Sequence, residues 1–144
     1  MINFLRGGGK DVSSDKNFIK SWNEQFNNNF LSKKDITRYI AGKSISNVEL
    51  VEGDILETLD AYIKENPRLR IALLHIDTDV YAPAIIGLEK LFDRVVRGGV
   101  IVFDDYACVE GETLAVEEFF ADKPEYVLKK FTFSHRKPSF VVKK

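Results

Sequence analysis

Two short apolar segments of this chain each end in acidic residues, and this pattern constrains the fold more than any other. Residues 73–76 lead into Asp77, and residues 100–103 lead into the pair Asp104 and Asp105. An apolar run of this length that follows a helical pattern is typical of a buried parallel strand. Because neighbouring parallel strands end at the same edge of a sheet, we expect the three aspartates to lie together there.

The acidic strand ends predict a cation site. Clustered carboxylates repel one another and resist burial unless a proton or a cation neutralises them. Oxygen ligands without clustered histidine or cysteine favour Mg²⁺ or another hard divalent ion over zinc. Spacing alone leaves open an alternative in which Asp77, Asp104 and Asp105 only cap the loops and helices that follow. Asp79, two residues beyond Asp77, is interpreted as a loop or capping residue.

The remaining patterns alternate between strand and helix, which predicts an α/β fold. Expected strands cover 48–51, 69–77 and 100–104, expected helices cover 56–63, 85–95 and 114–120, and two last strands lie near 126–133 and 139–143. The predicted sheet is mostly parallel, with a C-terminal antiparallel β-hairpin at one edge. Residues 1–45 are assigned to an N-terminal helical segment, and residues 46–144 to an α/β domain.

The N-terminal segment carries two helix signals. Its first signal is a set of four aromatic residues spaced four positions apart, which places them on one helix face: Phe18, Trp22, Phe26 and Phe30. We interpret this face as a packing stripe, with a ligand or partner surface as the alternative. Ser32 and Asp35 have the spacing of a capping box and predict a second helix that ends near Ala41.

Composition excludes several functional classes. The 144 residues carry a net charge of −1, so no overall field attracts nucleic acid or a membrane surface. A single cysteine excludes an internal disulfide, and the sequence shows neither a signal peptide nor an apolar stretch that could span a bilayer. We therefore expect a cytoplasmic, soluble protein.

Gly53 and Asp54 form a second candidate binding element. They follow the expected strand 48–51 and precede a helix, where a glycine lets the backbone approach a ligand closely. Asp54 could accept hydrogen bonds from an adenine amino group or a ribose. The alternative is that Asp54 only caps the next helix.

The two histidines receive different interpretations. His75 lies within an expected buried strand and is interpreted as a core residue. His135 lies in the loop of the expected C-terminal hairpin, where a general base could reach a substrate hydroxyl. An exposed loop histidine with no catalytic role is the alternative for His135.

Two segments resemble a known family in their order and composition. Residues 74–81 (Leu-His-Ile-Asp-Thr-Asp-Val-Tyr) and 98–106 (Gly-Gly-Val-Ile-Val-Phe-Asp-Asp-Tyr) resemble the macrocin O-methyltransferase-like (TylF-type) family. Residues 51–54 and 137–140 are similar to further blocks of that family, so the resemblance covers about 46–144. These proteins are class I enzymes that transfer a methyl group from S-adenosylmethionine to hydroxyls of deoxysugars.

The resemblance implies a role for each candidate residue. Asp77, Asp104 and Asp105 match the aspartates that bind Mg²⁺, which orients the acceptor hydroxyl and favours its deprotonated form. Gly53 and Asp54 match positions near the adenine of the cofactor, and Asp77 is also assigned to cofactor binding. No family base matches His135 securely, so its catalytic role rests on its position in the loop.

The N-terminal part departs from the family pattern. Such enzymes begin with a strand, a glycine-rich turn and a second strand that ends in an acid, and this chain starts too late to contain them. The resemblance therefore implies a truncated Rossmann-like sheet and a truncated or split methyltransferase. The partners that it implies are a small-molecule substrate with a sugar or glycoside hydroxyl, and a complementing N-terminal fragment or further copies of the chain. The alternatives are a non-catalytic remnant acting as an interaction module and an unrelated Mg²⁺-dependent phosphate-handling domain, against which the lack of a phosphate loop counts.

Overall fold

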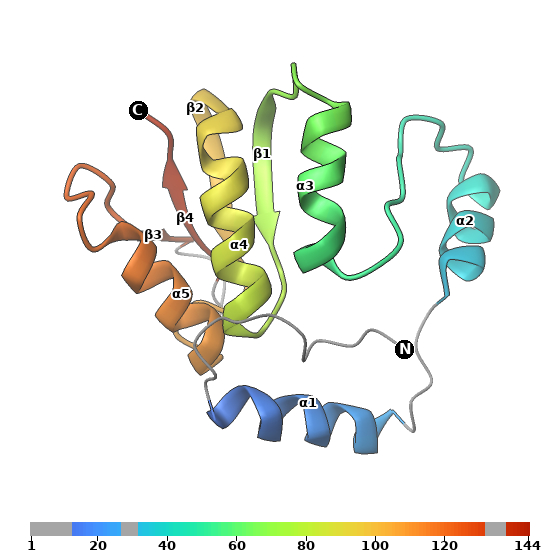
Figure 1. Cartoon of the computed structure of the whole chain (residues 1–144), viewed down its shortest axis with the longest axis horizontal. Helices are drawn as coiled ribbons and strands as arrows, with labels where there is room; N and C mark the ends of the chain where they lie inside the picture. Colours follow the sequence, from blue (N-terminus) through green and yellow to red (C-terminus); the bar gives the residue numbers. More distant parts are fainter. Residues whose placement is uncertain (1–12, 27–31, 132–137) are drawn as a thin grey trace.

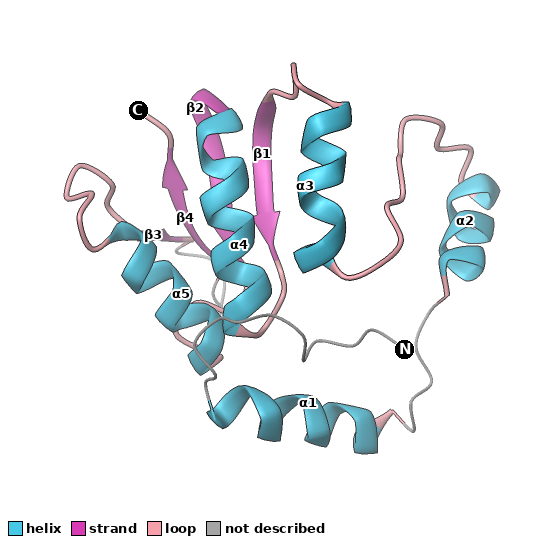
Figure 2. Cartoon of the chain, in the orientation of Figure 1, coloured by secondary structure: helices cyan, strands magenta, loops and turns pink. Residues whose placement is uncertain are grey.

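A computed structural model describes residues 13–26, 32–131 and 138–144 and shows helices beside a four-stranded sheet (Figures 1 and 2). The helices are α1 (Ser13–Gln25), α2 (Lys33–Gly42), α3 (Ile55–Glu65), α4 (Tyr81–Leu91) and α5 (Glu110–Phe120), with a 3₁₀ turn η1 (Phe92–Arg94). The strands are β1 (Ile71–Ile76), β2 (Val95–Phe103), β3 (Lys129–Lys130) and β4 (Ser139–Val142). Among the described residues, no helix has both the length and the apolar character needed to cross a bilayer.

The sheet has the strand order β1-β2-β4-β3. β1 pairs with β2 in parallel, while β4 pairs antiparallel with both β2 and β3. β1, β2 and β3 therefore run in one direction and β4 runs in the other. This arrangement confirms the predicted α/β fold with a mostly parallel sheet and a C-terminal antiparallel hairpin.

The hydrophobic core lies between the sheet and helices α4 and α5. Alternate residues of the two parallel strands face these helices, because successive side chains of a strand point to opposite sides. Ile76 pairs with Phe103 across the two strands, and both are buried. The other buried residues at this interface are Leu74, Ala84, Leu88, Ile101, Ala115 and Val116.

The opposite face of β1 is exposed, which makes the interpretation of His75 as a core residue wrong. The side chain of His75 is 47% exposed, and Leu73 on the same face is 63% exposed. In the described part of the chain, the helices that pack on β1 and β2 cover the other face, where the core cluster lies. An apolar strand composition predicts burial on both faces, but burial also requires a layer on each side.

One predicted strand is absent, and one predicted helix ends earlier than expected. Residues 48–51 form no strand, and Val48 and Val51 are exposed. A strand needs a neighbour for its backbone hydrogen bonds, and no strand of the described sheet pairs with residues 48–51. The expected helix 85–95 ends earlier, since Val95 already begins β2 and pairs with Ile71.

The two N-terminal helices form where the sequence predicts them, but no residue of α1 is buried, and Trp22 and Phe26 are exposed, so the interpretation of a packing stripe is wrong for the described residues. Ser32 and Asp35 form the predicted capping box, in which the Ser32 hydroxyl accepts from the Asp35 N–H at 3.2 Å and the Asp35 carboxylate accepts from the Ser32 N–H at 3.2 Å. On α1, the rings of Trp22 and Phe26 stack with centroids 4.7 Å apart, and Phe18 lies 6.1 Å from Trp22. Phe30, the fourth aromatic of this stripe, lies outside the described residues.

Helix α1 is attached to the start of α4 by one long-range hydrogen bond. Val80, the N-cap of α4, makes no side-chain capping bond, and Asp15 of α1 accepts from the Tyr81 N–H at 2.8 Å. Gly111 of α5 allows this close approach, because a Cβ there would lie 2.6 Å from the Tyr81 nitrogen and closer still to the Asp15 carboxylate. The N-terminal ends of α4 and α5 thus meet α1 at one point, along the lower side of Figure 1.

Tyr81 also joins α4 to α5 and should titrate unusually late. Its hydroxyl donates to the Glu118 carboxylate at 2.6 Å, and this hydrogen bond, with burial, raises the Tyr81 pKa to about 12. The folded protein keeps this proton up to a higher pH than the unfolded chain, whose tyrosine pKa is about 10. The free energy of unfolding should therefore fall as pH rises from about 10 to about 12.

Absorbance of tyrosinate at 295 nm during an alkaline titration checks this expectation. We expect one of the five tyrosines to ionise in a separate late step, and Tyr81→Phe to remove that step. Tyr39→Phe, at an exposed position of α2, should leave the late step in place. A late step that survives in Tyr81→Phe would contradict the assignment.

Candidate metal site

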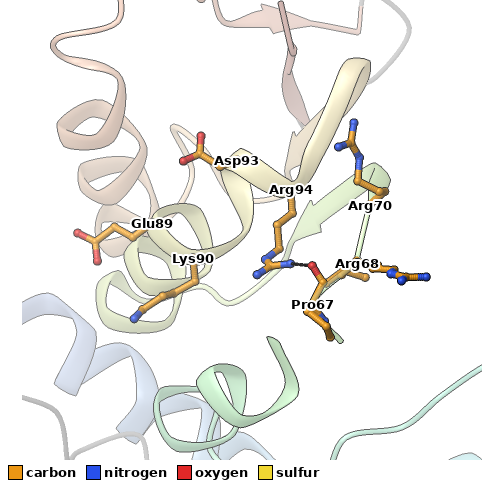
Figure 3. A pocket seen from close by; sticks show the side chains of 8 residues that line it. Pro67, Arg68, Arg70, Glu89, Lys90, Asp93 and Arg94 are labelled. Atoms are coloured by element: carbon orange, nitrogen blue, oxygen red, sulfur yellow. Dashed lines mark hydrogen bonds between the residues drawn. The ribbon is translucent and has the colours of Figure 1, made fainter. Parts of the chain in front are cut away.

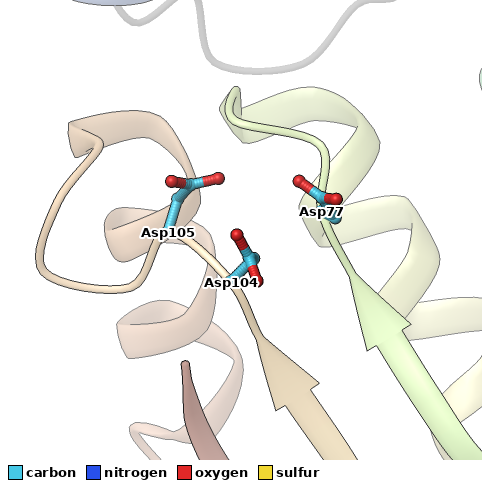
Figure 4. Close-up of side chains that lie close together, drawn as sticks. All are labelled: Asp77, Asp104 and Asp105. Atoms are coloured by element: carbon cyan, nitrogen blue, oxygen red, sulfur yellow. The ribbon is translucent and has the colours of Figure 1, made fainter. Parts of the chain in front are cut away.

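The acidic ends of β1 and β2 meet at one edge of the sheet, as the sequence predicts. Asp77 directly follows β1, and Asp104 and Asp105 directly follow β2 (Figure 4). The Asp104 N–H donates to the Ile76 carbonyl at 3.0 Å, which continues the strand pairing up to the site. One carboxylate oxygen from each aspartate lies within 4.8 Å of those of the other two.

The dimensions and donor types of this cluster fit a hard divalent cation. Metal–oxygen bonds of about 2.1 Å, as for Mg²⁺, place two ligand oxygens no more than about 4.2 Å apart. The observed limit of 4.8 Å is a few tenths of an ångström wider, and the side chain of Asp77 is exposed and has room to rotate. His75 adds a nitrogen beside the cluster, with Nε2 3.3 Å from Asp104 Oδ1.

Asp79 is a fourth member of the cluster that the sequence interpretation missed. It lies in the loop after β1, as expected, with a left-handed backbone (φ 60°). Burial raises its pKa to about 6, and the charge of Asp105, a hydrogen bond with Asp105 and the charges of Asp77 and Asp104 add to this shift. Burial also raises the pKa of Asp105. The cluster thus concentrates more negative charge than its surroundings stabilise, which favours a proton or a cation there.

Glu112 lies behind the site and contacts both loops that form it. This residue of α5 is fully buried. Its Oε1 accepts from the Asp105 N–H at 3.0 Å, its Oε2 accepts from the Thr78 N–H at 3.4 Å, and its own N–H donates to the Asp79 carbonyl at 3.1 Å. Burial raises the pKa of Glu112 to about 7, although the two backbone hydrogen bonds oppose the shift.

Sequence analysis did not identify Glu112, although a signal was present. Glu112, Ala115 and Val116 follow helical spacing and share the buried face of α5. An acidic residue on an otherwise apolar helix face requires buried hydrogen-bond partners. The position of Glu112 in the sequence therefore indicates that its carboxylate makes buried hydrogen bonds, as it does with the loops after β1 and β2.

Gly53 and Asp54 precede α3, whose N-terminal end lies on the side of the sheet where β1 ends (Figure 1). Gly53 has φ 136°, and a Cβ there would lie 2.7 Å from Thr58 Cγ2, so both backbone and space require glycine. Asp54 Oδ1 accepts from the Leu56 N–H at 2.9 Å and caps α3. Asp54 therefore caps α3, and its additional role in cofactor binding stays a prediction.

His135 lies outside the described residues, so its role as a general base also stays a prediction. The chain enters β4 at Ser139, which pairs with Phe103. Phe103 is the residue before Asp104. Strand β4 therefore begins at the sheet edge that carries the acidic cluster.

A separate open depression of about 670 Å³ lies near the amino ends of β1 and β2 (Figure 3). Its lining residues are Pro67, Arg68, Leu69, Arg70, Glu89, Lys90, Asp93 and Arg94. Arg94 donates to the Pro67 carbonyl at 3.2 Å across it. The acidic cluster follows the carboxyl ends of the same strands, so the two features lie at opposite edges of the sheet.

Comparison with known proteins agrees with this fold and this family resemblance. The solved structure of CalS11, described as a TDP-rhamnose 3'-O-methyltransferase of calicheamicin biosynthesis, is 29% identical with a TM-score of 0.58, and the match covers 65% of this chain and 40% of that chain. A second CalS11 structure, described as a calicheamicin methyltransferase, has the same identity and TM-score over 36% of its length. The O-methyltransferase NovP, at 20% identity, shows the fold alone, with a TM-score of 0.76 over 95% of this chain and 55% of that chain.

These coverages define the extent of the similarity. The chain spans between 36% and 55% of the length of these solved structures. No curated protein sequence matches it. The family model for macrocin-O-methyltransferase (TylF) matches residues 31–125, more than half of the chain. The chain belongs to the macrocin O-methyltransferase (TylF) family.

Proposed function

We propose that this chain forms the cation- and acceptor-binding part of an O-methyltransferase that uses S-adenosylmethionine and Mg²⁺ to methylate a sugar hydroxyl. The observation that carries the proposal is the convergence of Asp77, Asp104 and Asp105 within the segment that matches the family. The similarity to CalS11, a TDP-rhamnose 3'-O-methyltransferase, supports a deoxysugar, free or within a glycoside, as the acceptor class.

The side chains of the cluster would act on the acceptor hydroxyl. Bound Mg²⁺ would supply Lewis acidity and a fixed point of attachment for that hydroxyl. Asp77, Asp104 and Asp105 would hold the cation. Asp79, a carboxylate beside the three proposed ligands, would accept the hydroxyl proton. His135 is the alternative base.

Gly53, Asp54 and Asp77 would contribute to the cofactor site. The exposed backbone at Gly53 permits close approach of a ligand, and the Asp54 carboxylate would accept a hydrogen bond from it beside its capping bond. Transfer of a methyl group from a sulfonium requires in-line placement of donor and acceptor. Binding and orientation are therefore the main tasks of these residues.

Complete activity would require additional polypeptide. The chain spans 36% to 55% of the solved relatives, and β1 is an edge strand of the described sheet. We propose that a complementing N-terminal fragment or a second copy of the chain completes the cofactor site. The position of β1 as the outermost strand of the described sheet also favours a second candidate function. In this alternative the chain is a non-catalytic methyltransferase fold that acts by binding a partner.

Calorimetry with S-adenosylmethionine, with and without Mg²⁺, tests the proposal. We expect Mg²⁺ to bind, and cofactor binding to strengthen when Mg²⁺ is present. Asp54→Asn is a sharp variant, because asparagine caps helices as well as aspartate does but carries no charge. It should weaken cofactor binding while the melting temperature stays unchanged.

The outcomes separate the two candidates. No heat at millimolar cofactor would exclude an enzyme that works alone, and Mg²⁺ binding without cofactor binding would favour the non-catalytic fold. Transfer of a labelled methyl group to deoxysugar nucleotides or glycosides, after addition of a complementing fragment, would establish the activity. A chain that binds neither ligand and transfers no methyl group with the fragment added would exclude the enzyme and leave the non-catalytic fold.

A further inference from the structure

We propose that Glu112 is a positioning residue that clamps the loops after β1 and β2 together and so sets the spacing of Asp77, Asp104 and Asp105. The clamp is a property of the fold, and its effect on a bound cation rests on the function proposed above. Glu112 stands behind the cluster on α5 and is not itself one of the three candidate ligands.

The clamp consists of three hydrogen bonds from one residue. The two carboxylate oxygens of Glu112 accept from different loops, Oε1 from the Asp105 N–H at 3.0 Å and Oε2 from the Thr78 N–H at 3.4 Å. The Glu112 N–H donates to the Asp79 carbonyl at 3.1 Å. Thr78 and Asp79 directly follow Asp77, and Asp105 is itself a candidate ligand. One buried side chain therefore connects the loops that carry all three aspartates.

Each of the two loops contains one residue with an unfavourable backbone conformation, so contacts from outside the loop are needed to hold it. Asp79 and Ala107 both adopt left-handed conformations, with φ of 60° and 65°. Residues other than glycine hold such conformations only where the surroundings impose them. The loop after β2 has a further support, since Thr113 accepts from the Ala107 N–H at 2.8 Å. In the loop after β1, Glu112 makes two hydrogen bonds, one with the Thr78 N–H and one with the Asp79 carbonyl.

A buried carboxylate is a costly way to stabilise a fold. Taking a carboxylate out of water is unfavourable. An apolar side chain in its place removes that cost but leaves two backbone N–H groups without their acceptor. Glu112 is fully buried among apolar neighbours on α5, which include Ala115 and Val116. Unlike a leucine side chain, the Glu112 carboxylate has two acceptor oxygens, and each accepts a hydrogen bond from a different loop.

The chemistry of the side chain leads to a graded set of variants. Glu112→Leu removes both acceptors and keeps most of the volume. Glu112→Gln keeps one acceptor and turns an N–H₂ group toward the other backbone N–H, so it can satisfy one loop only. Glu110→Gln is the matched control, because it removes the same charge from an exposed position two residues away on α5.

Three measurements on the full chain test the clamp. The first is amide exchange of Thr78 and Asp105 by NMR, the second is the affinity for Mn²⁺ as a paramagnetic substitute for Mg²⁺, and the third is the urea midpoint. In Glu112→Leu, both amides should exchange at least tenfold faster and Mn²⁺ affinity should fall 10- to 100-fold, as for residues that orient metal ligands. The urea midpoint should fall only modestly, because two N–H groups lose their acceptor but the cost of burying a charge is removed. Glu112→Gln should lose protection at one amide, with a smaller loss of affinity, and Glu110→Gln should match the wild type.

Each contrary outcome has a definite meaning. Unchanged exchange at both amides in Glu112→Leu would overturn the clamp. Faster exchange with unchanged Mn²⁺ affinity would reduce Glu112 to a structural residue and overturn its positioning role. A wild-type chain that binds no Mn²⁺ would overturn the proposed function, and the exchange data would then decide the clamp alone. If Glu112→Leu does not fold, Glu112→Gln supplies the same comparisons.

Discussion

Replacing Asp104 by asparagine should weaken Mg²⁺ binding on the order of 100-fold or more. The substitution exchanges an anionic ligand at the centre of the cluster for a neutral amide, and Mg²⁺ sites depend on charged oxygen donors. Even residues that only orient ligands cost 10- to 100-fold when removed, so loss of a ligand should cost at least as much. Titration calorimetry with Mg²⁺ measures the change directly.

The same variant should have the opposite effect on stability when no cation is present. Asp104 lies among Asp77, Asp79 and Asp105, and removing one negative charge relieves their repulsion. Without Mg²⁺ we expect Asp104→Asn to melt at or above the wild-type temperature. With Mg²⁺ only the wild type should gain stability, because a ligand that binds the folded state shifts the folding equilibrium.

An exposed carboxylate far from the site supplies the control. Asp122 follows α5 and pairs with Lys123 at 2.7 Å. Asp122→Asn should bind Mg²⁺ as the wild type does. Equal Mg²⁺ affinity in Asp104→Asn and the wild type would exclude Asp104 from a metal site and leave the alternative in which the aspartates only cap the loops.

Phe103→Ala should lower the free energy of unfolding by about 3–5 kcal/mol, the usual cost of removing a buried aromatic ring. Phe103 is fully buried in β2, pairs with Ile76 and Ser139 on the two neighbouring strands, and lies 6.0 Å from the ring of Phe120. The loss is a large part of the 5–15 kcal/mol that stabilises a typical domain. Urea denaturation of both proteins measures it.

Leu73→Ala provides a matched comparison on the other face of the sheet. Leu73 lies in β1 and is 63% exposed, so its truncation should change stability by about 0.5 kcal/mol or less. If Phe103→Ala does not fold, Phe103→Leu keeps much of the volume and should fall between the other two. A cost for Leu73→Ala as large as that for Phe103→Ala would mean that this face is covered in solution.

The elements predicted correctly are those with local signals. The capping box at Ser32 and Asp35, and the helical spacing of residues 56–63, depend on residues within one or two turns. The convergence of the three aspartates was also predictable, because the carboxyl ends of neighbouring parallel strands share an edge. Each of these inferences needs no knowledge of the rest of the chain.

The errors concern contacts between distant segments. His75 was placed in the core, but which face of β1 is covered depends on where α4 and α5 pack. Val95 was placed in a helix, but its pairing with Ile71 extends β2. Glu112 was missed because its partners lie on two loops, Thr78 and Asp105, which only the folded chain brings together.

The bond between Asp15 and the Tyr81 N–H has a consequence for the order of folding. It joins residues 66 positions apart, whereas the unit from β1 to α5 forms through contacts between elements separated by one intervening helix or strand, such as β1 with β2 and α4 with α5. Closing a long loop costs entropy before its contacts compensate, so α1 should dock after that unit has formed. It should also be the first element to detach, and brief proteolysis under native conditions should cut within α1 before it cuts α4 or α5.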